Sequence, residues 1–286
     1  RYAMPLIMGH EIVGRIAGVG PAAARRWGVK EGDRVAVEST VRCGFCRACV
    51  EGSYKYCRDG AGYGTRTPAD QPPHLWGAYS QYMYLAPGTS MLKVPEGMST
   101  ELAMLCTVAI GNGLRWTVLK GGAKVGDAVV IQGVGPIGLA CVAAAKEAGA
   151  GPIIATGLRS DAYRLKLARE FGADCVVDVE SEDVVERVRE VTGGELADLV
   201  VDVTGSGNAV RTSLKLVRPK GTVVSAGVTG DETLTPLPLD ALLYKEIHVQ
   251  GVFSYDNDAM RRTLKLAQRG KYPFEKLVTH KFPLER

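Results

Sequence analysis

Four closely spaced cysteines constrain the fold of this chain more than any other feature. Three of them lie in the run Cys43-Gly44-Phe45-Cys46-Arg47-Ala48-Cys49, and Cys57 follows after seven intervening residues. Thiols spaced in this way can converge on one ion without help from a distant part of the chain. Four sulfur ligands around a closed tetrahedral centre suit a structural Zn²⁺ ion. The sequence therefore predicts structural zinc ligands at Cys43, Cys46, Cys49 and Cys57.

Other uses of these cysteines fit the sequence less well. In a ferredoxin-type iron–sulfur run the fourth cysteine follows after three residues and precedes proline. Here the gap before Cys57 is longer and Arg58 follows it. Two unrelated disulfides or four free thiols stay open as alternatives, although disulfides are disfavoured because nothing else in the chain is typical of a secreted protein.

Length and composition exclude several classes of protein. A chain of 286 residues is long enough for two domains, and its 46% hydrophobic and 23% charged residues are typical of a soluble globular protein. The mild net charge of +4 gives no strong case for a nucleic-acid or membrane partner. No stretch approaches the roughly 18 uninterrupted apolar residues of a membrane helix, and the N-terminus lacks a signal-peptide pattern. We expect a cytoplasmic protein that binds neither nucleic acid nor membrane.

The chain has two halves of different texture. Residues 1 to about 100 contain short β-segments broken by Gly and Pro, the clearest at 12–19, 33–38 and 79–85. That pattern is typical of a small β-barrel or sandwich with loop insertions, one of which carries the cysteines.

After a helical stretch near 101–120, strands alternate with helices, which favours a parallel sheet covered on both faces. Expected helices include 161–171 and 182–192, the second with its valines on one face. Six strands with intervening helices predict an α/β fold with a doubly wound Rossmann sheet. The expected strands are 128–131, 153–156, 175–178, 199–203, 222–225 and 247–250.

A glycine-rich turn follows the first of these strands. Gly133-Val134-Gly135-Pro136-Ile137-Gly138 matches G-x-G-x-x-G, and an Ala-rich helix follows at 139–148. Glycines let the backbone turn and approach a pyrophosphate, while the helix N-terminus supplies N–H groups that hold its charge. An ordinary Gly-rich βα turn is the alternative. In this context we predict that all six residues bind a dinucleotide.

The order of these motifs resembles a known family. Gly9-His10-Glu11-Ile12-Val13-Gly14, Gly32-Asp33-Arg34-Val35, the cysteines, Gly77-Ala78-Tyr79-Ser80-Gln81-Tyr82 and the glycine turn occur as in zinc-dependent alcohol dehydrogenases of the medium-chain dehydrogenase/reductase superfamily. The resemblance implies a GroES-like catalytic domain at 1–105 with a zinc lobe at about 40–60, a Rossmann NAD(P)-binding domain at 106–250, and a return to the catalytic domain at 251–286. It also implies a chain truncated at both ends relative to the family, and a homodimer or homotetramer.

Three residues match the family's catalytic zinc site. The resemblance makes His10 and Cys106 zinc ligands, and Glu11 a carboxylate that binds the ion or lies next to it. The alternatives are a hydrogen-bonded polar His10, a surface charge at Glu11 and a buried free thiol at Cys106. Cys141 and Cys175 are interpreted as core residues. The family's remaining zinc-binding cysteine and the hydroxyl that starts its proton relay come from a segment upstream of Gly9.

The resemblance implies an oxidoreductase that interconverts an alcohol and its aldehyde or ketone by hydride transfer. Zinc in an open site would act as a Lewis acid on the substrate oxygen. The alternative is a cofactor-binding protein of the same fold with little or no dehydrogenase activity, because its catalytic zinc site is incomplete. A zinc-ribbon nucleic-acid binder is disfavoured, since no basic face surrounds the cysteines.

The end of the second Rossmann strand predicts the cofactor. NAD-binding units place Asp or Glu there to hold the ribose 2′-hydroxyl. Here Gly157 occupies that place, and Arg159 follows in a Gly-x-Arg turn similar to that of NADP-dependent members of the family. We expect Gly157 and Arg159 to bind NADP(H) rather than NAD(H), with Asp161, or alternatively Ser160, capping the next helix. The alternative is an NAD enzyme in which Arg159 is a solvated loop residue.

Overall fold

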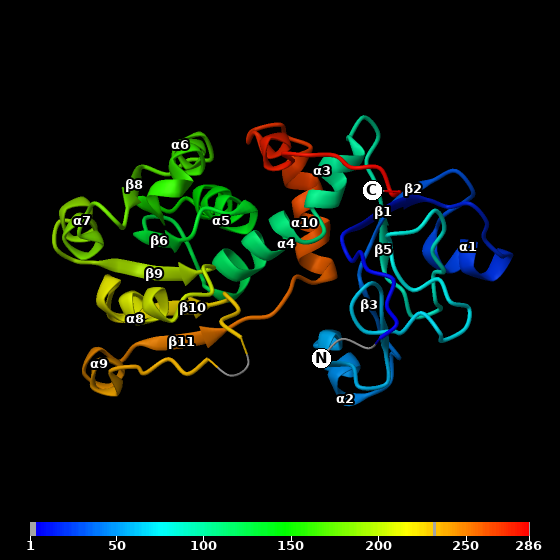
Figure 1. Ribbon diagram of the computed structural model, residues 1–286, viewed down its shortest axis with the longest axis horizontal. Coiled ribbons are helices and arrows are strands. Elements are labelled where there is room, and N and C mark those ends of the chain that lie inside the picture. Colours follow the sequence, from blue (N-terminus) through cyan, green and yellow to red (C-terminus); the bar gives the residue numbers. More distant parts are fainter. Residues whose placement is uncertain (1–3, 231–232, 286) are drawn as a thin grey trace. The chain divides into compact units, whose positions relative to one another are not determined.

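The computed structural model describes residues 4–230 and 233–285, and the contacts between residues divide the chain into two units. Unit 1 holds the chain up to Val108, then Asp256–Gly270, and the residues from Phe274 onward. Unit 2 holds Ala109–Tyr255 and Lys271–Pro273. Figure 1 colours the chain by sequence, so that the Rossmann-like sheet of unit 2 runs from green to orange.

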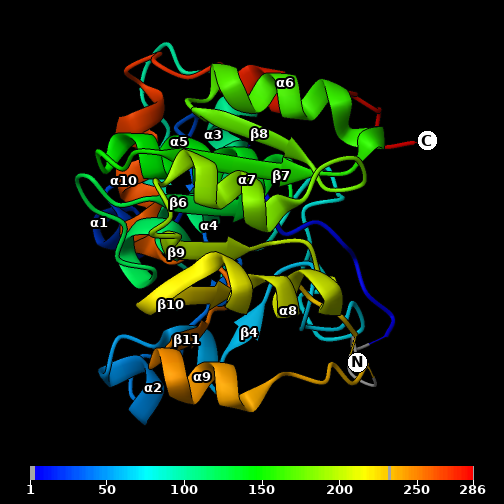
Figure 2. The ribbon, with the colours of Figure 1, turned by 90° about the vertical axis from the view of Figure 1, so that its left-hand side faces the viewer.

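Unit 2 contains the six strands expected from the sequence, in one parallel sheet of order β11-β10-β9-β6-β7-β8. Figure 2 shows these strands side by side from β8 to β11. The first strand of the unit, β6, lies between β7 and β9, so the strand order reverses there. This is the strand order and topological switch point of a Rossmann domain, and the predicted α/β fold is confirmed. The strands are β6 (Val129–Gln132), β7 (Ile153–Gly157), β8 (Cys175–Asp178), β9 (Ala197–Asp202), β10 (Val217–Ser225) and β11 (His248–Gly251).

Helices between the strands cover the sheet because each buries an apolar stripe. The predicted valine face of α7 packs, through Val184, Val185, Val188 and Val191, on a core cluster that includes Val130, Val177 and Val200. Helices α5 and α6 contact each other as well as the sheet. The helices of the unit include α5 (Pro136–Glu147), α6 (Ala162–Glu170), α7 (Val184–Val191), α8 (Gly207–Leu216) and α9 (Leu239–Lys245).

The expected helical stretch at 101–120 is divided into three segments. These are α3 (Thr100–Leu105), capped by Ser99, α4 (Ala109–Leu114) and the π-helix η2 (Arg115–Lys120). By length and composition, Thr100–Lys120 is the one described stretch that could cross a membrane, but 61% of its most apolar window is buried inside the protein. Burial of this kind is usual for the core helix of a globular protein.

Unit 1 is built from short strands and loops around its own core. Strands β1 (Ile12–Arg15), β2 (Arg34–Val37) and β5 (Met91–Lys93) form an antiparallel sheet, and β3 (Thr40–Val41) pairs with β4 (Ala61–Gly62). Its core cluster includes Ile12, Val35, Val37, Tyr63 and Trp76. The helices of the unit are α1 (Pro21–Trp27), α2 (Arg47–Val50), η1 (Tyr54–Tyr56), α3, α10 (Asn257–Ala267) and η4 (Phe274–Leu277).

One expected strand of unit 1 is wrong. Residues 79–85 form bends and irregular backbone rather than a strand. The Ser80 hydroxyl lies 2.7 Å from the carbonyl of Gly77 and 2.8 Å from that of Tyr82, so it ties the segment into a turn. Local side-chain bonds of this kind compete with a strand ladder. Tyr79 and Tyr82 are exposed, so their β-propensity has no sheet to pack against.

Candidate functional site

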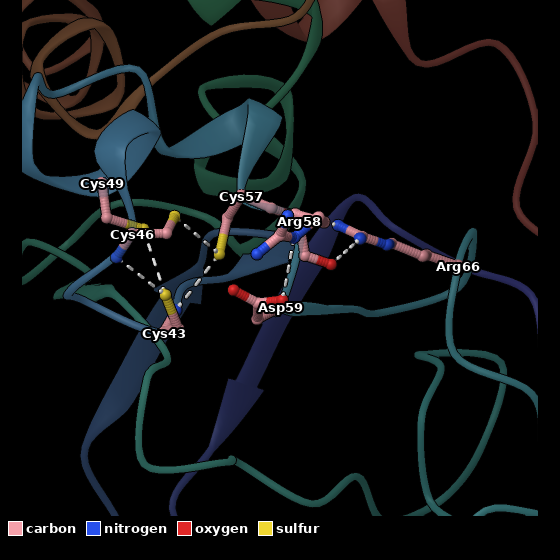
Figure 3. A network of polar contacts seen from close by, with 7 residues as sticks. All are labelled: Cys43, Cys46, Cys49, Cys57, Arg58, Asp59 and Arg66. Carbon is pink, nitrogen blue, oxygen red and sulfur yellow. Dashed lines mark hydrogen bonds and ion pairs between the residues drawn. The ribbon is translucent and has the colours of Figure 1, made fainter.

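The four predicted zinc ligands converge in unit 1, as Figure 3 shows. Cys43 follows β3, and Cys46 directly precedes α2. Cys49 lies in α2, and Cys57 directly follows η1. The Sγ atoms of Cys43 and Cys49 are 3.9 Å apart, and those of Cys46 and Cys57 are 3.8 Å apart. Tetrahedral zinc with Zn–S bonds of about 2.3 Å places its sulfur ligands about 3.8 Å from one another. The geometry therefore fits the structural zinc site.

Backbone N–H groups around the cluster favour thiolates. The N–H of Cys43 lies 3.4 Å from Sγ of Cys57, and the N–H of Cys46 lies 3.4 Å from Sγ of Cys43. Burial raises the pKa of the Cys43 thiol, but the N–H groups of Phe45 and Cys46 and the neighbouring thiols outweigh it and lower the pKa to about 6. Burial raises the pKa of Cys49 to about 12. A divalent cation would offset the cost of assembling four thiolates here.

Arg66 supports the cysteine lobe, a role that the sequence did not signal. One guanidinium nitrogen donates to the carbonyl of Cys57 at 2.7 Å and the other to the carbonyl of Arg58 at 2.8 Å (Figure 3). The planar fork of arginine suits two adjacent carbonyls. The backbone of Cys57, the last of the four predicted zinc ligands, is thus fixed.

A second support is a buried polar network between the lobe and α10. The Tyr54 hydroxyl donates to Glu38 at 3.0 Å and accepts from the N–H of Asn257, the first residue of α10, at 2.7 Å. Glu38 is fully buried, and burial raises the pKa of its carboxyl above the ordinary value, which Lys55 and Tyr54 only partly oppose. Nothing in the sequence around Tyr54 indicates that its hydroxyl links Glu38 to α10.

Close backbone packing holds the Gly9-His10-Glu11 motif. The N–H of Ala78 donates to the carbonyl of Gly9 at 3.0 Å, and Gly9 has a φ of +97°, a region that favours glycine. A Cβ added to Gly64 would lie 2.2 Å from the Gly9 carbonyl oxygen, and one added to Gly77 would lie 2.0 Å from that of Ile7. Gly64 and Gly77 are therefore required by the segment that carries His10, a packing role that was not predicted for either residue.

The three residues predicted for a catalytic zinc are not gathered in the way the four cysteines are. His10 and Glu11 are exposed, whereas Cys106 is fully buried at the C-terminal end of α3. Among the described residues, the four lobe cysteines form the one group of three or more His, Cys, Asp or Glu side chains whose ligand atoms lie close together. His10, Glu11 and Cys106 supply donors that zinc accepts, but they do not form such a group in this structure.

Desolvation raises the pKa of both Glu11 and Cys106. Desolvation raises the pKa of Glu11, with His10 opposing it. Burial raises the pKa of the Cys106 thiol to about 12, and the Thr263 hydroxyl on α10 donates to the Cys106 carbonyl at 3.0 Å. Burial therefore disfavours the thiolate form of Cys106. Cys141 and Cys175 are buried on α5 and β8, consistent with their interpretation as core residues.

In unit 2 the glycine turn has the geometry of a phosphate loop. Gly133 has a φ of +101°, Gly135 precedes α5 in extended conformation, and Pro136 occupies its first turn. A Cβ added to Gly138 would lie 1.9 Å from the carbonyl oxygen of Gly133. Gly133 and Gly138 therefore permit close strand–helix packing, and the N–H groups of the first turn of α5 stay available for an anion.

A buried carboxyl lies beside this loop and was not predicted. Asp202 ends β9, and one of its oxygens accepts from the N–H and hydroxyl of Thr204 at 3.2 and 2.6 Å. Its other oxygen has no hydrogen-bond partner among the described atoms, and burial raises its pKa. A Cβ added to Gly133 would meet Thr204 at 3.2 Å, so Asp202 and Thr204 back the turn from the neighbouring strand. The sequence Asp202-Val203-Thr204, at the end of the predicted strand 199–203, could have indicated this supporting role.

The end of β7 carries the predicted cofactor-selecting residues. Gly157 is buried, and a Cβ there would lie 2.8 Å from Cγ2 of Val134 in the glycine turn. Arg159 begins the short turn η3 (Arg159–Asp161), and its side chain is 74% exposed. Asp161 stands at the N-cap of α6, but its carboxylate accepts from the N–H of Leu158 and pairs with Arg164 rather than bonding the first N–H groups of α6.

A hollow of about 1090 Å³ lies in unit 1. Apolar side chains such as Ile16, Trp27 and Leu85 line it, and no predicted metal or cofactor residue does. Its size therefore carries no argument for a catalytic centre.

A Rossmann sheet with a turn of phosphate-loop geometry, in one chain with four cysteines arranged as metal ligands, indicates the class of dinucleotide-binding proteins that also have a zinc site. Residues 1–96 match the model of the alcohol dehydrogenase GroES-like domain, and residues 136–269 match that of zinc-binding dehydrogenases. The chain therefore belongs to the zinc-binding alcohol dehydrogenases of the medium-chain dehydrogenase/reductase superfamily, which are oxidoreductases acting on alcohols. The family resemblance and the GroES-like and Rossmann folds expected from the sequence are confirmed.

Individual relatives agree with this assignment. A probable alcohol dehydrogenase of Mycobacterium tuberculosis is 46% identical over 277 residues, covering 95% of this chain and 75% of the relative. An L-threonine 3-dehydrogenase of Bacillus licheniformis is 33% identical over 286 residues, covering 100% of this chain and 78% of the relative.

Solved structures are similar over the same span. The alcohol dehydrogenase of Thermotoga maritima superposes with a TM-score of 0.89 at 29% identity, covering 99% of this chain and 79% of that one. A zinc-binding dehydrogenase of Sinorhizobium meliloti, bound to NADP, superposes with a TM-score of 0.81 at 25% identity, covering 96% and 76%.

Proposed function

We propose that this protein interconverts an alcohol and its aldehyde or ketone by transferring hydride to or from NADP(H). Its membership of the zinc-binding alcohol dehydrogenases supports the reaction class. The observation that carries the cofactor-binding role is the turn Gly133–Gly138 at the switch point of the sheet, where Gly133 has a positive φ and the backbone around Gly138 packs too closely for any side chain. We assign pyrophosphate binding to Gly133, Val134, Gly135, Pro136, Ile137 and Gly138.

His10 and Cys106, with Glu11 at or beside the ion, are our proposed residues for a catalytic zinc. Such an ion supplies a Lewis acid at the substrate oxygen when it is bound. Cys106 must lose its proton to bind a metal, and its burial makes that loss costly unless a cation takes the proton's place. The Thr263 hydroxyl fixes the Cys106 backbone, and the glycines around Gly9 fix that of His10.

The test of this assignment is His10→Ala, measured by zinc content and by turnover of a panel of alcohols. We expect the wild type to bind two zinc ions per chain and the variant one, with dinucleotide affinity retained and turnover abolished. The exposed His280, changed to Ala, is the matched control and should retain both ions. Retained turnover in His10→Ala would show that His10 takes no part in the reaction.

A second candidate function is cofactor binding with little or no dehydrogenase activity. The separate placement of His10, Glu11 and Cys106, which do not form a group in the described structure, favours it. One zinc ion per wild-type chain, with intact NADP(H) binding and no turnover across the panel, would select this alternative. Two ions with turnover would exclude it.

The choice of NADP(H) rests on the end of β7. A carboxylate at position 157, as in NAD-binding Rossmann units, would overlap Val134 because even a Cβ lies 2.8 Å from it. The exposed guanidinium of Arg159, two residues on, can pair with a 2′-phosphate through two parallel hydrogen bonds. The structural similarity to a dehydrogenase bound to NADP supports the same choice.

We would test this with kcat/KM for NADP and NAD before and after Arg159→Ala. We expect NADP to be preferred and the variant to lose about tenfold or more with NADP alone, since a charge-assisted bidentate contact is removed. Lys166→Ala, an exposed cation on α6, removes the same charge and should leave the ratio unchanged. A wild-type preference for NAD would show that this assignment is wrong.

A further inference from the structure

The carboxylates of Asp178, the last residue of β8, and of Glu180, in the turn that follows, lie against Arg159. The backbone N–H of Arg159 donates to Oε2 of Glu180 at 2.7 Å, and its Nε lies 3.7 Å from Oδ2 of Asp178. Both contacts lie within unit 2, where β7 and β8 run side by side in register, with Gly157 opposite Asp178. Arg159, the residue proposed to bind the 2′-phosphate, therefore already contacts two carboxylates of the chain itself.

The turn that presents Glu180 is held by its own hydrogen bonds. Asp178 accepts from the N–H of Glu180 at 3.0 Å and from the Ser181 hydroxyl at 2.8 Å. The N–H of Val179 donates to the Gly157 carbonyl at 3.0 Å, which ties the turn to β7. The N–H of Glu180 and then the Ser181 hydroxyl lower the pKa of Asp178, so Asp178 is ionised at neutral pH. Glu180 is thus aimed at Arg159, although its side chain is exposed and can move away.

A 2′-phosphate bound by the Arg159 guanidinium would lie beside the Glu180 carboxylate, which already accepts from the backbone N–H of Arg159. With a pyrophosphate at the Gly133–Gly138 turn, the adenosine ribose of a dinucleotide reaches the end of the second strand, here β7. A phosphate there would seek the N–H and guanidinium of Arg159, and would meet a like charge already bonded to that N–H. A free 2′-hydroxyl is neutral and can donate to a carboxylate, so it meets no such repulsion.

We propose that Glu180 is a specificity-determining residue that competes with the 2′-phosphate of NADP(H) for Arg159. The proposal rests on the proposed function, since it assumes that the dinucleotide ribose reaches Arg159. Glu180 lowers the affinity for NADP(H) and leaves that for NAD(H) unchanged or slightly raised. The protein thereby retains use of NAD(H) despite the arginine.

The test is Glu180→Gln, with dissociation constants for NADP⁺ and NAD⁺ from isothermal titration calorimetry. Glutamine keeps an oxygen that can accept from the Arg159 N–H, so the turn is preserved and only the charge is lost. We expect NADP⁺ to bind about 3- to 10-fold more tightly, as for loss of one repulsive charge at an exposed site, and NAD⁺ not more tightly than in the wild type. Adenosine 2′,5′-bisphosphate and AMP should show the same contrast, and the gain should shrink at high salt.

The exposed Glu195 follows α7 and provides the matched control. Glu195→Gln removes the same charge and should change neither dissociation constant. An unchanged NADP⁺ affinity in Glu180→Gln, or an equal gain for NAD⁺, overturns the proposal. Its failure is separable from that of the cofactor assignment. The NAD/NADP ratio of the wild type and the Arg159→Ala variant test the cofactor assignment, and the response to Glu180→Gln tests the competition.

Discussion

Single glycines decide whether the phosphate turn can form. Gly138 and Gly135 make a matched pair, because a Cβ on Gly138 would lie 1.9 Å from the Gly133 carbonyl oxygen, whereas a Cβ on Gly135 meets nothing within 4 Å. Gly135 also has an ordinary φ of −65°, so alanine fits there without backbone strain.

We therefore expect the two alanine variants to fail in different ways. Gly138→Ala should lower the free energy of unfolding by roughly 1–3 kcal/mol, as overpacking does, and weaken dinucleotide binding with it. Gly135→Ala should keep the wild-type Tm and weaken only dinucleotide binding, since its new methyl faces the place that the pyrophosphate approaches. Calorimetric Tm and dinucleotide affinity measured together check this. Equal stability losses in both variants would contradict the interpretation of the turn.

Of the residues at the end of β7, two were predicted from the sequence, whereas their partner Glu180 was not. Gly157 and Arg159 were predicted from their distance beyond the glycine turn, and the structure places both at the end of β7. Glu180, on the next strand's turn, could not be linked to Arg159 from sequence, because their contact depends on the register of β7 with β8. Only a strand pairing brings such residues together.

At the scale of elements, we expect the folding of the cysteine lobe to depend on a bound metal. We expect Cys57→Ser to release one equivalent of zinc and to lower the Tm, because the remaining three thiols cannot complete a tetrahedral site. Cys175→Ser, a buried thiol on β8, should cost stability but retain all zinc. Atomic absorption and thermal denaturation of both variants check this, and unchanged zinc content in Cys57→Ser would refute the assigned site.

The network that joins the lobe to α10 should make stability depend on pH. Burial raises the pKa of Glu38 in the folded protein, so the native state holds a proton that the unfolded chain releases near its ordinary value of 4.5. The contribution of Glu38 to the free energy of unfolding is then greatest at low pH, and it is lost as the pH rises through the pKa that Glu38 has in the folded protein. Tyr54 and Lys55 oppose the shift and Asp256 adds to it.

Glu38→Gln removes this titration and keeps an oxygen to accept from Tyr54. We expect the free energy of unfolding of the variant to rise relative to that of the wild type from about pH 5 to about pH 8. Glu31→Gln, an exposed carboxylate of the same unit, should show no such trend. A pH-independent difference for Glu38→Gln would mean that Glu38 is ionised throughout.

The whole molecule is expected to be a homodimer or homotetramer. The sheet of unit 2 ends at β11, an edge strand whose Val249 is 46% exposed, and an open edge strand is a site for pairing with another chain. Sedimentation velocity should show a dimer or tetramer, and Val249→Lys should shift it toward monomer without loss of zinc. A wild-type monomer at micromolar concentration would contradict the expectation.

Sequence alone determined the features that depend on local spacing. The lobe cysteines and the glycine turn each lie within one short segment, so their chemical roles can be predicted without knowledge of the fold. The six Rossmann strands were predicted because a buried parallel strand needs an apolar run, although their ends shifted by one or two residues and β10 began earlier. The segment 79–85 was misread as a strand because its aromatic residues satisfy β-propensity, while a serine hydroxyl bonds it into a turn.

Only the tertiary structure decided what depends on contacts between distant segments. Gly64 and Gly77 are required because the backbone of residues 7–9 passes within van der Waals distance of them. Tyr54 bonds to the N–H of Asn257, which is 203 residues away in sequence. Glu180 reaches Arg159 because β7 and β8 pair in parallel. In each case the energy belongs to a pair of groups that the folded backbone brings together, and the spacing of residues along the chain does not encode that proximity.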